Sequence, residues 1–216
     1  MWRRVLTALG IIGATVAVHE AAHAVAASRG GGTVKEIGVG FGPALFRTTV
    51  RRLPLVVRAF PLGGYAAVDV EQIPPRRRIG MLLAGPLTNI ALGAPLLYAL
   101  RHHPAPVLGD DGKAVGLTGF LGTFSALFQA TDQGPGSLGR LAGAINVGLG
   151  LMNLMPIYPL DGGHVVASVM EARGASPRAR SAFMRVTAVA FALLVQSAMM
   201  ADLRRLTAAR RRRPAV

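Results

Sequence analysis

The chain has no cysteine, few acidic residues and few aromatic side chains, and each shortage excludes a class of protein. Without cysteine, neither a disulfide framework nor a thiolate metal site can form in these 216 residues. A transition-metal site must then use histidine, aspartate or glutamate, and this donor set favours zinc. Ten acidic residues stand against 24 lysines and arginines, for a net charge of +14, while aromatic residues make up only 6%. Because the basic residues lack neighbouring aromatic side chains on which bases could stack, we expect no nucleic-acid partner.

Long apolar stretches are what the sequence has in abundance. Hydrophobic residues make up 51% of the chain and its mean hydropathy is +0.43, values typical of a polytopic membrane protein. The basic residues lie between these stretches and in the tail, where they would face anionic headgroups, so membrane lipid is an expected partner. We predict an α-helical polytopic membrane protein with one domain over residues 1–216. About four transmembrane helices are expected, at residues 5–27, 79–100, 141–170 (broken at 156–163) and 181–201.

Two further segments have the pattern of other elements. Between residues 33 and 70, short β-favouring runs alternate with glycine and proline, which predicts a small membrane-associated antiparallel sheet or hairpin. Residues 61–65 (PLGGY) should interrupt it, because adjacent Gly63 and Gly64 allow either a close backbone approach or a plain turn. Residues 117–130 carry apolar side chains on one helical face, which predicts an amphipathic helix at the membrane interface.

The first apolar run contains the sequence HEAAH at residues 19–23. His19 and His23 lie on one face of a helix, where both imidazoles can bind one metal ion. Glu20 between them is placed to act on the water that such a metal activates. Ionisable groups inside an apolar span are costly and mark a functional site. Two other interpretations stay open here: a chance occurrence of the short motif, and a signal peptide whose cleavage at residues 22–24 would cut through it.

A third metal ligand is expected far along the chain. The apolar stretch 141–170 holds one central acidic residue, Asp161, beside two prolines and two glycines. Prolines three residues apart cannot sit in an unbroken helix, and irregular backbone at membrane depth must be buried in protein or line a cavity. A lone carboxylate at such a break needs a cation, so Asp161 is predicted to join the two histidines and leave one coordination position open. His164, about one turn further on, is the second candidate.

The second span contains Pro86 and Asn89 within the sequence GPLTN. Pro86 lacks an N–H group and so frees a backbone carbonyl. The Asn89 amide, almost one turn further on, can reach a neighbouring helix. We predict that both residues support the site, although plain helix–helix packing explains the asparagine equally well.

Five short motifs follow one another along the chain. They are HEAAH at 19–23, IGVGFGPAL at 37–45, PLGGY at 61–65, GPLTN at 85–89 and NLMPIYPLDGGH at 153–164. In this order the set resembles the site-2 protease family of intramembrane zinc metalloproteases, and in particular the bacterial branch that includes RseP. The matches extend over most of the chain.

The resemblance implies an endopeptidase that cleaves transmembrane segments of membrane proteins in regulated intramembrane proteolysis. Its substrates would be transmembrane-helix proteins such as anti-sigma factors or signal-peptide remnants, in a bacterial inner or plasma membrane. It places one Zn²⁺ per chain on His19, His23 and Asp161, with Glu20 as the catalytic glutamate.

The resemblance also assigns residues to the substrate. Asn153 falls on an asparagine that helps to hold the substrate backbone, and Gly63 and Gly64 lie near the β-region that pairs with an unwound substrate. Such pairing makes physical sense, because strand addition replaces the hydrogen bonds that a substrate helix loses on unwinding.

One departure from the family concerns substrate choice. RseP-like relatives carry one or two PDZ domains between the second and third spans, whereas this chain has only about 40 residues there. We therefore expect selection by the amphipathic helix or by a separate adaptor protein.

The distribution of basic residues predicts how the chain is oriented in the membrane. Nine of them lie between Arg29 and Arg78, which predicts that the loop 29–78 is cytoplasmic. With four spans the arginine-rich tail would lie outside, against the same rule, unless the last helix is re-entrant or interfacial.

Two other functions compete with proteolysis. The first is a non-proteolytic membrane metal-binding transporter or sensor with the same ligands, but such a protein gains nothing from a general base at Glu20. The second is an inactive scaffold of the same fold, which the intact ligands and glutamate argue against.

Overall fold

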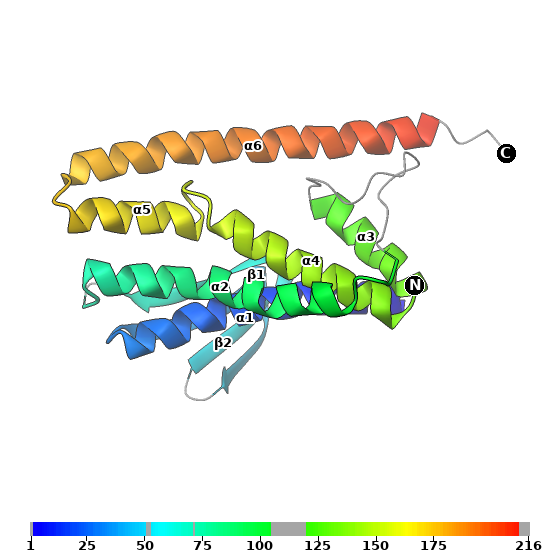
Figure 1. Ribbon diagram of the computed structural model, residues 1–216, viewed down its shortest axis with the longest axis horizontal. Coiled ribbons are helices and arrows are strands. Elements are labelled where there is room, and N and C mark those ends of the chain that lie inside the picture. The colour runs from blue at the N-terminus through cyan, green and yellow to red at the C-terminus, as the bar shows by residue number, and fades with distance from the viewer. Residues whose placement is uncertain (1, 51–52, 71, 105–119, 212–216) are drawn as a thin grey trace.

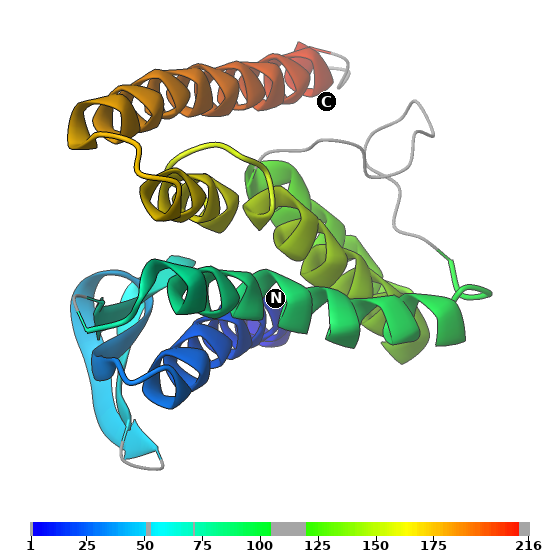
Figure 2. The same cartoon turned by 60° about the vertical axis from the view of Figure 1, so that its left-hand side comes forward.

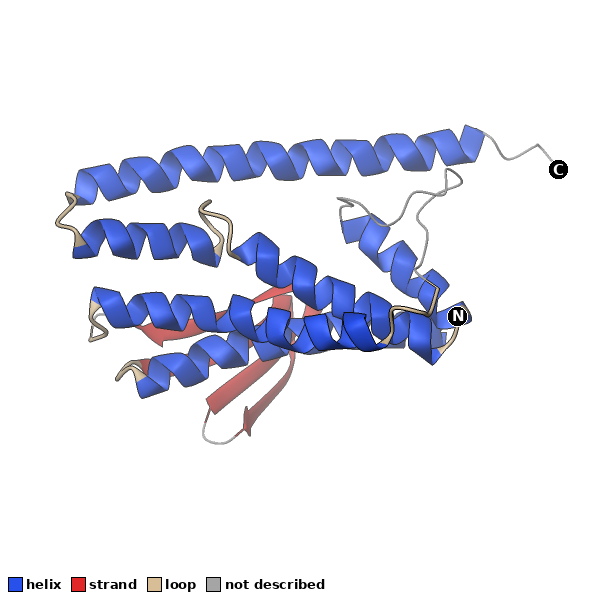
Figure 3. Ribbon diagram, viewed as in Figure 1, coloured by secondary structure: helices blue, strands red, loops and turns tan. Residues whose placement is uncertain are grey.

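The structure is a computed structural model that describes residues 2–50, 53–70, 72–104 and 120–211. This described part is mostly helical, with one two-stranded sheet that comes between the first two helices in chain order (Figures 1 and 3). This agrees with the predicted helical class with a small sheet. The elements are α1 (Trp2–Arg29), β1 (Thr33–Val50), β2 (Leu53–Asp69), α2 (Pro75–Ala99), α3 (Phe120–Asp132), α4 (Pro135–Asn153), α5 (Asp161–Ala172) and α6 (Pro177–Arg211).

Among the described residues, three helices are long and apolar enough to cross a membrane. Large apolar side chains remain exposed on them, such as Leu92 at 53% and Leu193 at 60%, which suits contact with lipid. These helices cover three of the four predicted spans. They are Trp2–Arg29, Pro75–Ala99 and Pro177–Ala201, which correspond to the predicted 5–27, 79–100 and 181–201.

The predicted third span at 141–170 is interrupted as expected, but the bounds of the break differ. The structure has two separate helices here, because α4 ends at Asn153 and the 12-residue α5 begins at Asp161. A helix of that length extends about 18 Å, too short to cross a ~30 Å hydrocarbon core. The break occupies residues 154–160, earlier than the predicted 156–163, because both prolines lie in the loop while the two glycines begin α5.

Gly162 and Gly163 belong to the first turn of α5 for a packing reason. A Cβ atom at Gly162 would lie 2.3 Å from the Met155 carbonyl oxygen, and one at Gly163 would lie 2.4 Å from the Tyr158 backbone nitrogen. The loop before α5 therefore folds back closely on the helix start. This packing holds Asp161 at the first position of the helix.

The sheet is a single antiparallel hairpin of β1 and β2. The sequence predicted shorter strands with an interruption at 61–65, and this was wrong, because β2 runs through Gly63 and Gly64. Several register shifts occur along the pair, and Gly40 and Gly63 have positive φ values of 89° and 90°. Glycine adopts these values without strain, so the hairpin bends where the sequence pattern indicated an end.

The helices are arranged around α2. It packs against α1 on one side and against α4 and α5 on the other, while α6 lies outermost beside α5 (Figures 1 and 2). The hairpin lies beside α1. One hydrophobic cluster joins α1, α3 and α4, and a second joins the end of α1 to the start of α2. His19 and His23 lie on the part of α1 between these two clusters.

The predicted amphipathic helix at 117–130 corresponds to α3, while residues 117–119 lie outside the described residues. Leu127 is fully buried in α3 and packs with Ala8 of α1 and Leu141 of α4. The Leu127 side of the helix therefore packs on protein rather than on lipid.

Candidate metal centre

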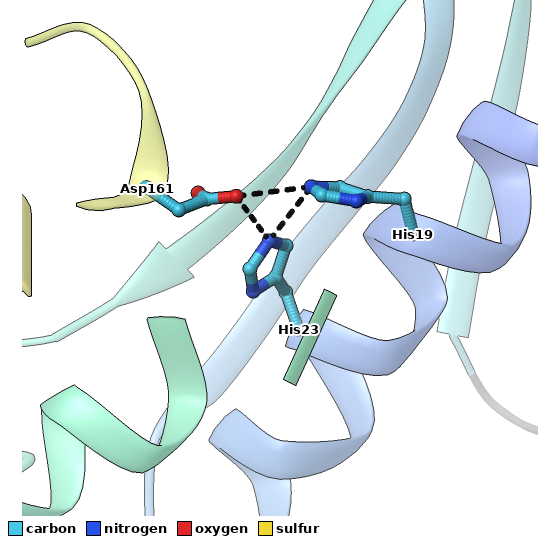
Figure 4. Close-up of side chains that lie close together, drawn as sticks. All are labelled: His19, His23 and Asp161. Carbon is cyan, nitrogen blue, oxygen red and sulfur yellow. Dashed lines mark hydrogen bonds and ion pairs between the residues drawn. The ribbon is translucent and has the colours of Figure 1, made fainter. Parts of the chain in front are cut away.

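Two helices far apart in the sequence bring three ligand-type side chains together (Figure 4). The helical period places His19 and His23 one turn apart on α1, and both are buried, with 5% and 7% exposure. Asp161 approaches them from the first position of α5. In Figure 4 the two rings and the carboxylate converge on one point.

The distances among these side chains suit a bound metal ion. His19 Nε2 lies 3.0 Å from Asp161 Oδ2, His23 Nε2 lies 3.3 Å from the same oxygen, and the two nitrogens are 3.1 Å apart. Ligand atoms about 2.0–2.1 Å from a tetrahedral zinc ion are about 3.3 Å from one another. The three atoms therefore form nearly one face of such a tetrahedron, and the donor set of two imidazoles and one carboxylate fits zinc.

The second nitrogen of each ring differs in its surroundings. His23 Nδ1 lies 2.8 Å from the Met81 carbonyl oxygen, a contact that suits an Nδ1–H donor and leaves Nε2 free to bind metal. His19 Nδ1 is buried and, within the described part of the chain, has no hydrogen-bond partner. The α2 backbone thus orients one of the two rings.

Gly85 of α2 also shapes the site and is not among the site residues predicted from the sequence. A Cβ atom at this position would lie 2.3 Å from His23 Nε2, so only glycine leaves room for the ring. The glycine lies in the sequence GPLTN, of which only Pro86 and Asn89 were predicted to support the site. In that motif the glycine, rather than its neighbours, contacts a predicted ligand.

Pro86 and Asn89 are fully buried in α2. The Pro86 carbonyl oxygen faces α4, since a Cβ atom at Gly150 would lie 2.6 Å from it. Neither side-chain atom of the Asn89 amide has a partner among the described residues. Both residues therefore lie in a closely packed part of α2, and their supporting role stays a prediction.

The hairpin crosses α1 at Glu20. A Cβ atom at Gly64 would lie 2.6 Å from Val16 Cγ1 and 2.9 Å from Glu20 Cγ, so β2 contacts the helix at van der Waals distance. Gly63 has positive φ and faces Phe41 instead. Glu20 is buried, with 9% exposure. The structure thus brings Gly64 and Glu20 together, as two walls of one site.

One cavity of about 660 Å³ joins these groups. Asn153 lines it from the end of α4, with its Nδ2 donating to the Leu149 carbonyl oxygen at 3.0 Å. His164 lines it from α5, with its ring edge-to-face against Tyr158 and outside the three-atom cluster. Of the predicted site residues, the cavity is lined by His19, Glu20, His23, Gly63, Gly64, Asn153, Asp161 and His164, and not by Pro86 and Asn89.

Comparison of this chain with known proteins points to one protein family. The chain matches the model of peptidase family M50 over residues 7–196. Zinc metalloprotease Rip1 of Mycobacterium tuberculosis is 32% identical over 199 residues, which cover 80% of this chain and 47% of that protein. Zinc metalloprotease RasP of Oceanobacillus iheyensis is 33% identical over 76 residues, which cover 33% of this chain and 18% of that protein. The chain thus spans about half the length of Rip1.

A solved structure is similar in fold. The site-2 protease from Methanocaldococcus jannaschii matches with a TM-score of 0.50 and 17% identity, covering 94% of this chain and 71% of that one. The two sequence relatives are named as zinc metalloproteases, and the nitrogen and oxygen donors of the cluster in this chain are ligands that suit zinc. Because the family model matches from residue 7 to residue 196, this chain belongs to peptidase family M50, the site-2 protease family.

Proposed function

We propose that this protein is an intramembrane zinc-dependent endopeptidase that cleaves transmembrane segments of membrane proteins. The observation that supports this most directly is the position of Glu20. It lines the same cavity as the three converging ligand atoms, on the helix that carries two of them. A metal carrier or sensor needs the ligands alone, whereas peptide hydrolysis also needs a base beside them.

His19, His23 and Asp161 are the residues that would hold one zinc ion per chain through Nε2, Nε2 and Oδ2. Zinc held there supplies Lewis acidity, which polarises a carbonyl group and makes water more acidic. The Met81 carbonyl keeps the His23 ring in the ligating orientation. Burial of the two histidines keeps competing water away from their nitrogens.

Glu20 acts as the proton carrier in the proposed reaction. Its carboxylate takes a proton from the attacking water, whose oxygen bonds to the scissile carbonyl carbon. The carbon–nitrogen bond then breaks, and the proton passes from Glu20 to the departing amide nitrogen. The products are a carboxylic acid and an amine, between which one further proton passes to give a carboxylate and an ammonium group, so one water molecule is consumed and Glu20 returns to its starting state.

The substrate must be unwound before this reaction. A transmembrane helix shields its amides with its own hydrogen bonds, and in a bilayer each broken bond needs a replacement. The cavity follows β2 from Gly63 to Val70, so an extended substrate segment could add along this strand. Asn153, which lines the same cavity, would hold the substrate backbone near the metal centre.

The proposal includes the cellular setting. The substrates would be transmembrane-helix proteins of a bacterial inner membrane, such as anti-sigma factors or signal-peptide remnants, and the 29–78 loop would be cytoplasmic. A separate adaptor protein would take over the substrate selection that PDZ domains perform in RseP-like relatives. Lipid would cover the exposed apolar faces of α1, α2 and α6.

The test compares the wild type with Glu20→Gln on tagged transmembrane substrates. Both proteins should carry about one zinc per chain, because the three ligands are unchanged, and only the wild type should release the cleaved fragments. Turnover by Glu20→Gln within about tenfold of the wild type would remove Glu20 from the proton-transfer role. Zinc uptake into vesicles that is equal for both proteins, without any cleavage, would favour a transporter.

A further inference from the structure

A charged cluster lies at the other end of the cavity that contains the metal centre. It consists of Arg78, Glu171 and Arg180, here called the Arg78–Glu171–Arg180 cluster, and all three side chains line that cavity. Arg78 is the fourth residue of α2 and Arg180 is the fourth residue of α6, while Glu171 is the last residue but one of α5. The three helix ends therefore meet at one point of the cavity wall.

The contacts within the cluster leave an excess of positive charge. One oxygen, Glu171 Oε2, lies 3.1 Å from Arg78 Nη1 and 2.5 Å from Arg180 Nη1. Two guanidinium groups thus share one carboxylate, and the net charge is +1. The N-termini of α2 and α6 add positive potential at the same place. A second carboxylate from a bound molecule would be attracted there, and a cation would be repelled.

The cluster is held in position but stays open to solvent. Arg78 Nη2 also donates to the carbonyl oxygens of Val70, at 3.4 Å, and Ile73, at 3.2 Å. The side chains of the cluster keep between 21% and 30% exposure. The guanidinium of Arg78 is therefore fixed against the end of β2, while the rim of the cavity remains accessible to a ligand.

The lengths of two segments give the separation between the cluster and the metal centre. Along α5, the ten residue steps from Asp161 to Glu171 extend about 15 Å. Along β2 and the residue that follows it, the six residue steps from Gly64, which contacts Glu20, to Val70, which contacts Arg78, extend about 20 Å. An extended peptide advances about 3.3 Å per residue, so a chain lying in the cavity covers the distance in about five residues.

We infer that the Arg78–Glu171–Arg180 cluster selects substrates that carry an acidic side chain about five residues from the scissile bond. This inference rests on the proposed function, because the substrate occupies the same cavity. The cluster lies at the ends of α2 and α6, both of which are long enough to span a membrane. An acidic residue bound there would leave the hydrocarbon core, where an ionised carboxylate is costly, while the scissile bond remains at the metal centre.

The experiment uses one transmembrane substrate with Glu, Gln or Lys placed five residues before or after the cleaved bond. For the wild type, kcat/KM should be at least about tenfold higher for Glu than for Lys on one of the two sides, mainly through KM. Arg180→Glu should invert this order and restore cleavage of the Lys substrate. The matched control is Arg178→Glu, an exposed position two residues earlier that does not line the cavity and should keep the wild-type preference.

Two outcomes overturn the inference and leave the proposed function intact. One is equal cleavage of the Glu, Gln and Lys substrates by the wild type. The other is an Arg180→Glu protein that loses activity on all of them without inversion, because the cluster then only ties α2, α5 and α6 together.

Binding without cleavage separates this inference from the proposed function. In the Glu20→Gln background, anisotropy of a labelled substrate segment should show tighter binding of the Glu form than of the Lys form, and the charge reversal at Arg180 should invert that order. Such binding, together with a wild type that cleaves nothing, would support the cluster and reject the protease. Equal binding of both forms, with cleavage by the wild type, would reject the role of the cluster and support the protease.

Discussion

Gly85 of α2 leaves the space that the His23 ring of α1 occupies. A Cβ atom on Gly85 would lie 2.3 Å from His23 Nε2, the nitrogen that converges with His19 and Asp161. The glycine is 62 positions from the histidine in sequence, yet it limits where the ligand can lie. A small residue in α2 is thus part of the candidate metal centre.

Replacement of Gly85 by alanine should weaken zinc binding. The added methyl group must push the His23 ring away from the other two ligands, so zinc affinity measured against a competing chelator should fall by about 10- to 100-fold. The matched control is Gly80→Ala on the same helix, where a Cβ atom meets nothing within 4 Å. Gly80→Ala should keep full zinc affinity, and unchanged affinity in Gly85→Ala would mean that the ring can shift without loss.

Removal of any one ligand should empty the site. Purified wild-type protein should contain about one zinc per chain, and His19→Ala, His23→Ala or Asp161→Ala should each lower this sharply, because two ligands bind the ion poorly. Elemental analysis after dialysis measures the loss. The control, His102→Ala, changes an exposed histidine outside the cluster and should retain the metal. Full occupancy in Asp161→Ala would exclude its oxygen as a ligand and direct attention to His164, which lines the same cavity.

A side chain at Gly64 should reduce cleavage while zinc stays bound. In Gly64→Ala the new methyl group would lie 2.6 Å from Val16 Cγ1 and 2.7 Å from the Gly38 carbonyl oxygen, so β2 must move off α1. We expect at least about a tenfold loss of kcat/KM, since a displacement of about 1 Å near a reacting group has this effect. Gly13→Ala on α1, where a Cβ atom meets nothing within 4 Å, is the control. Wild-type cleavage by Gly64→Ala would show that the contact between strand and helix does not position substrate.

The first helix should be retained in the mature protein. His19 and His23 lie on α1, so removal of that helix as a signal peptide would remove two of the three converging side chains. The intact mass of the membrane-purified protein should correspond to a chain that still contains residues 1–24. A chain that begins after Ala24 would support the signal-peptide interpretation and end the protease proposal.

The candidate site could be predicted from sequence where its parts follow from local rules. The helical period alone makes His19 and His23 neighbours, and a lone carboxylate among prolines in an apolar stretch singles out Asp161. His19 Nε2 and Asp161 Oδ2 lie 3.0 Å apart although 142 positions separate the two residues in sequence. This distance depends on how α5 packs, and spacing in the sequence carries no such information.

The errors in the fold have a common physical cause. Gly162 and Gly163 were interpreted as breaking a span, but their missing side chains admit the loop that packs on α5. For Gly63 and Gly64 the sequence left a plain turn and a close backbone approach open; β2 runs through both residues without a turn, and the close approach is the contact of Gly64 with α1. A glycine marks a place where the chain can turn or where another segment can approach, and the residue itself does not distinguish the two.

The sequence by itself determined the class of the protein, the helix that carries HEAAH and the donor types of the metal site, because hydropathy, helical period and the absence of cysteine are local properties. Only the tertiary structure decided that Gly85 makes room for His23, that Gly64 lies against Glu20, and that the cavity continues to Arg78 and Arg180. These relations depend on the packing of α2, β2 and α6 around α1 and α5. Packing of that kind arises from many weak contacts between distant segments, which no short stretch of sequence specifies.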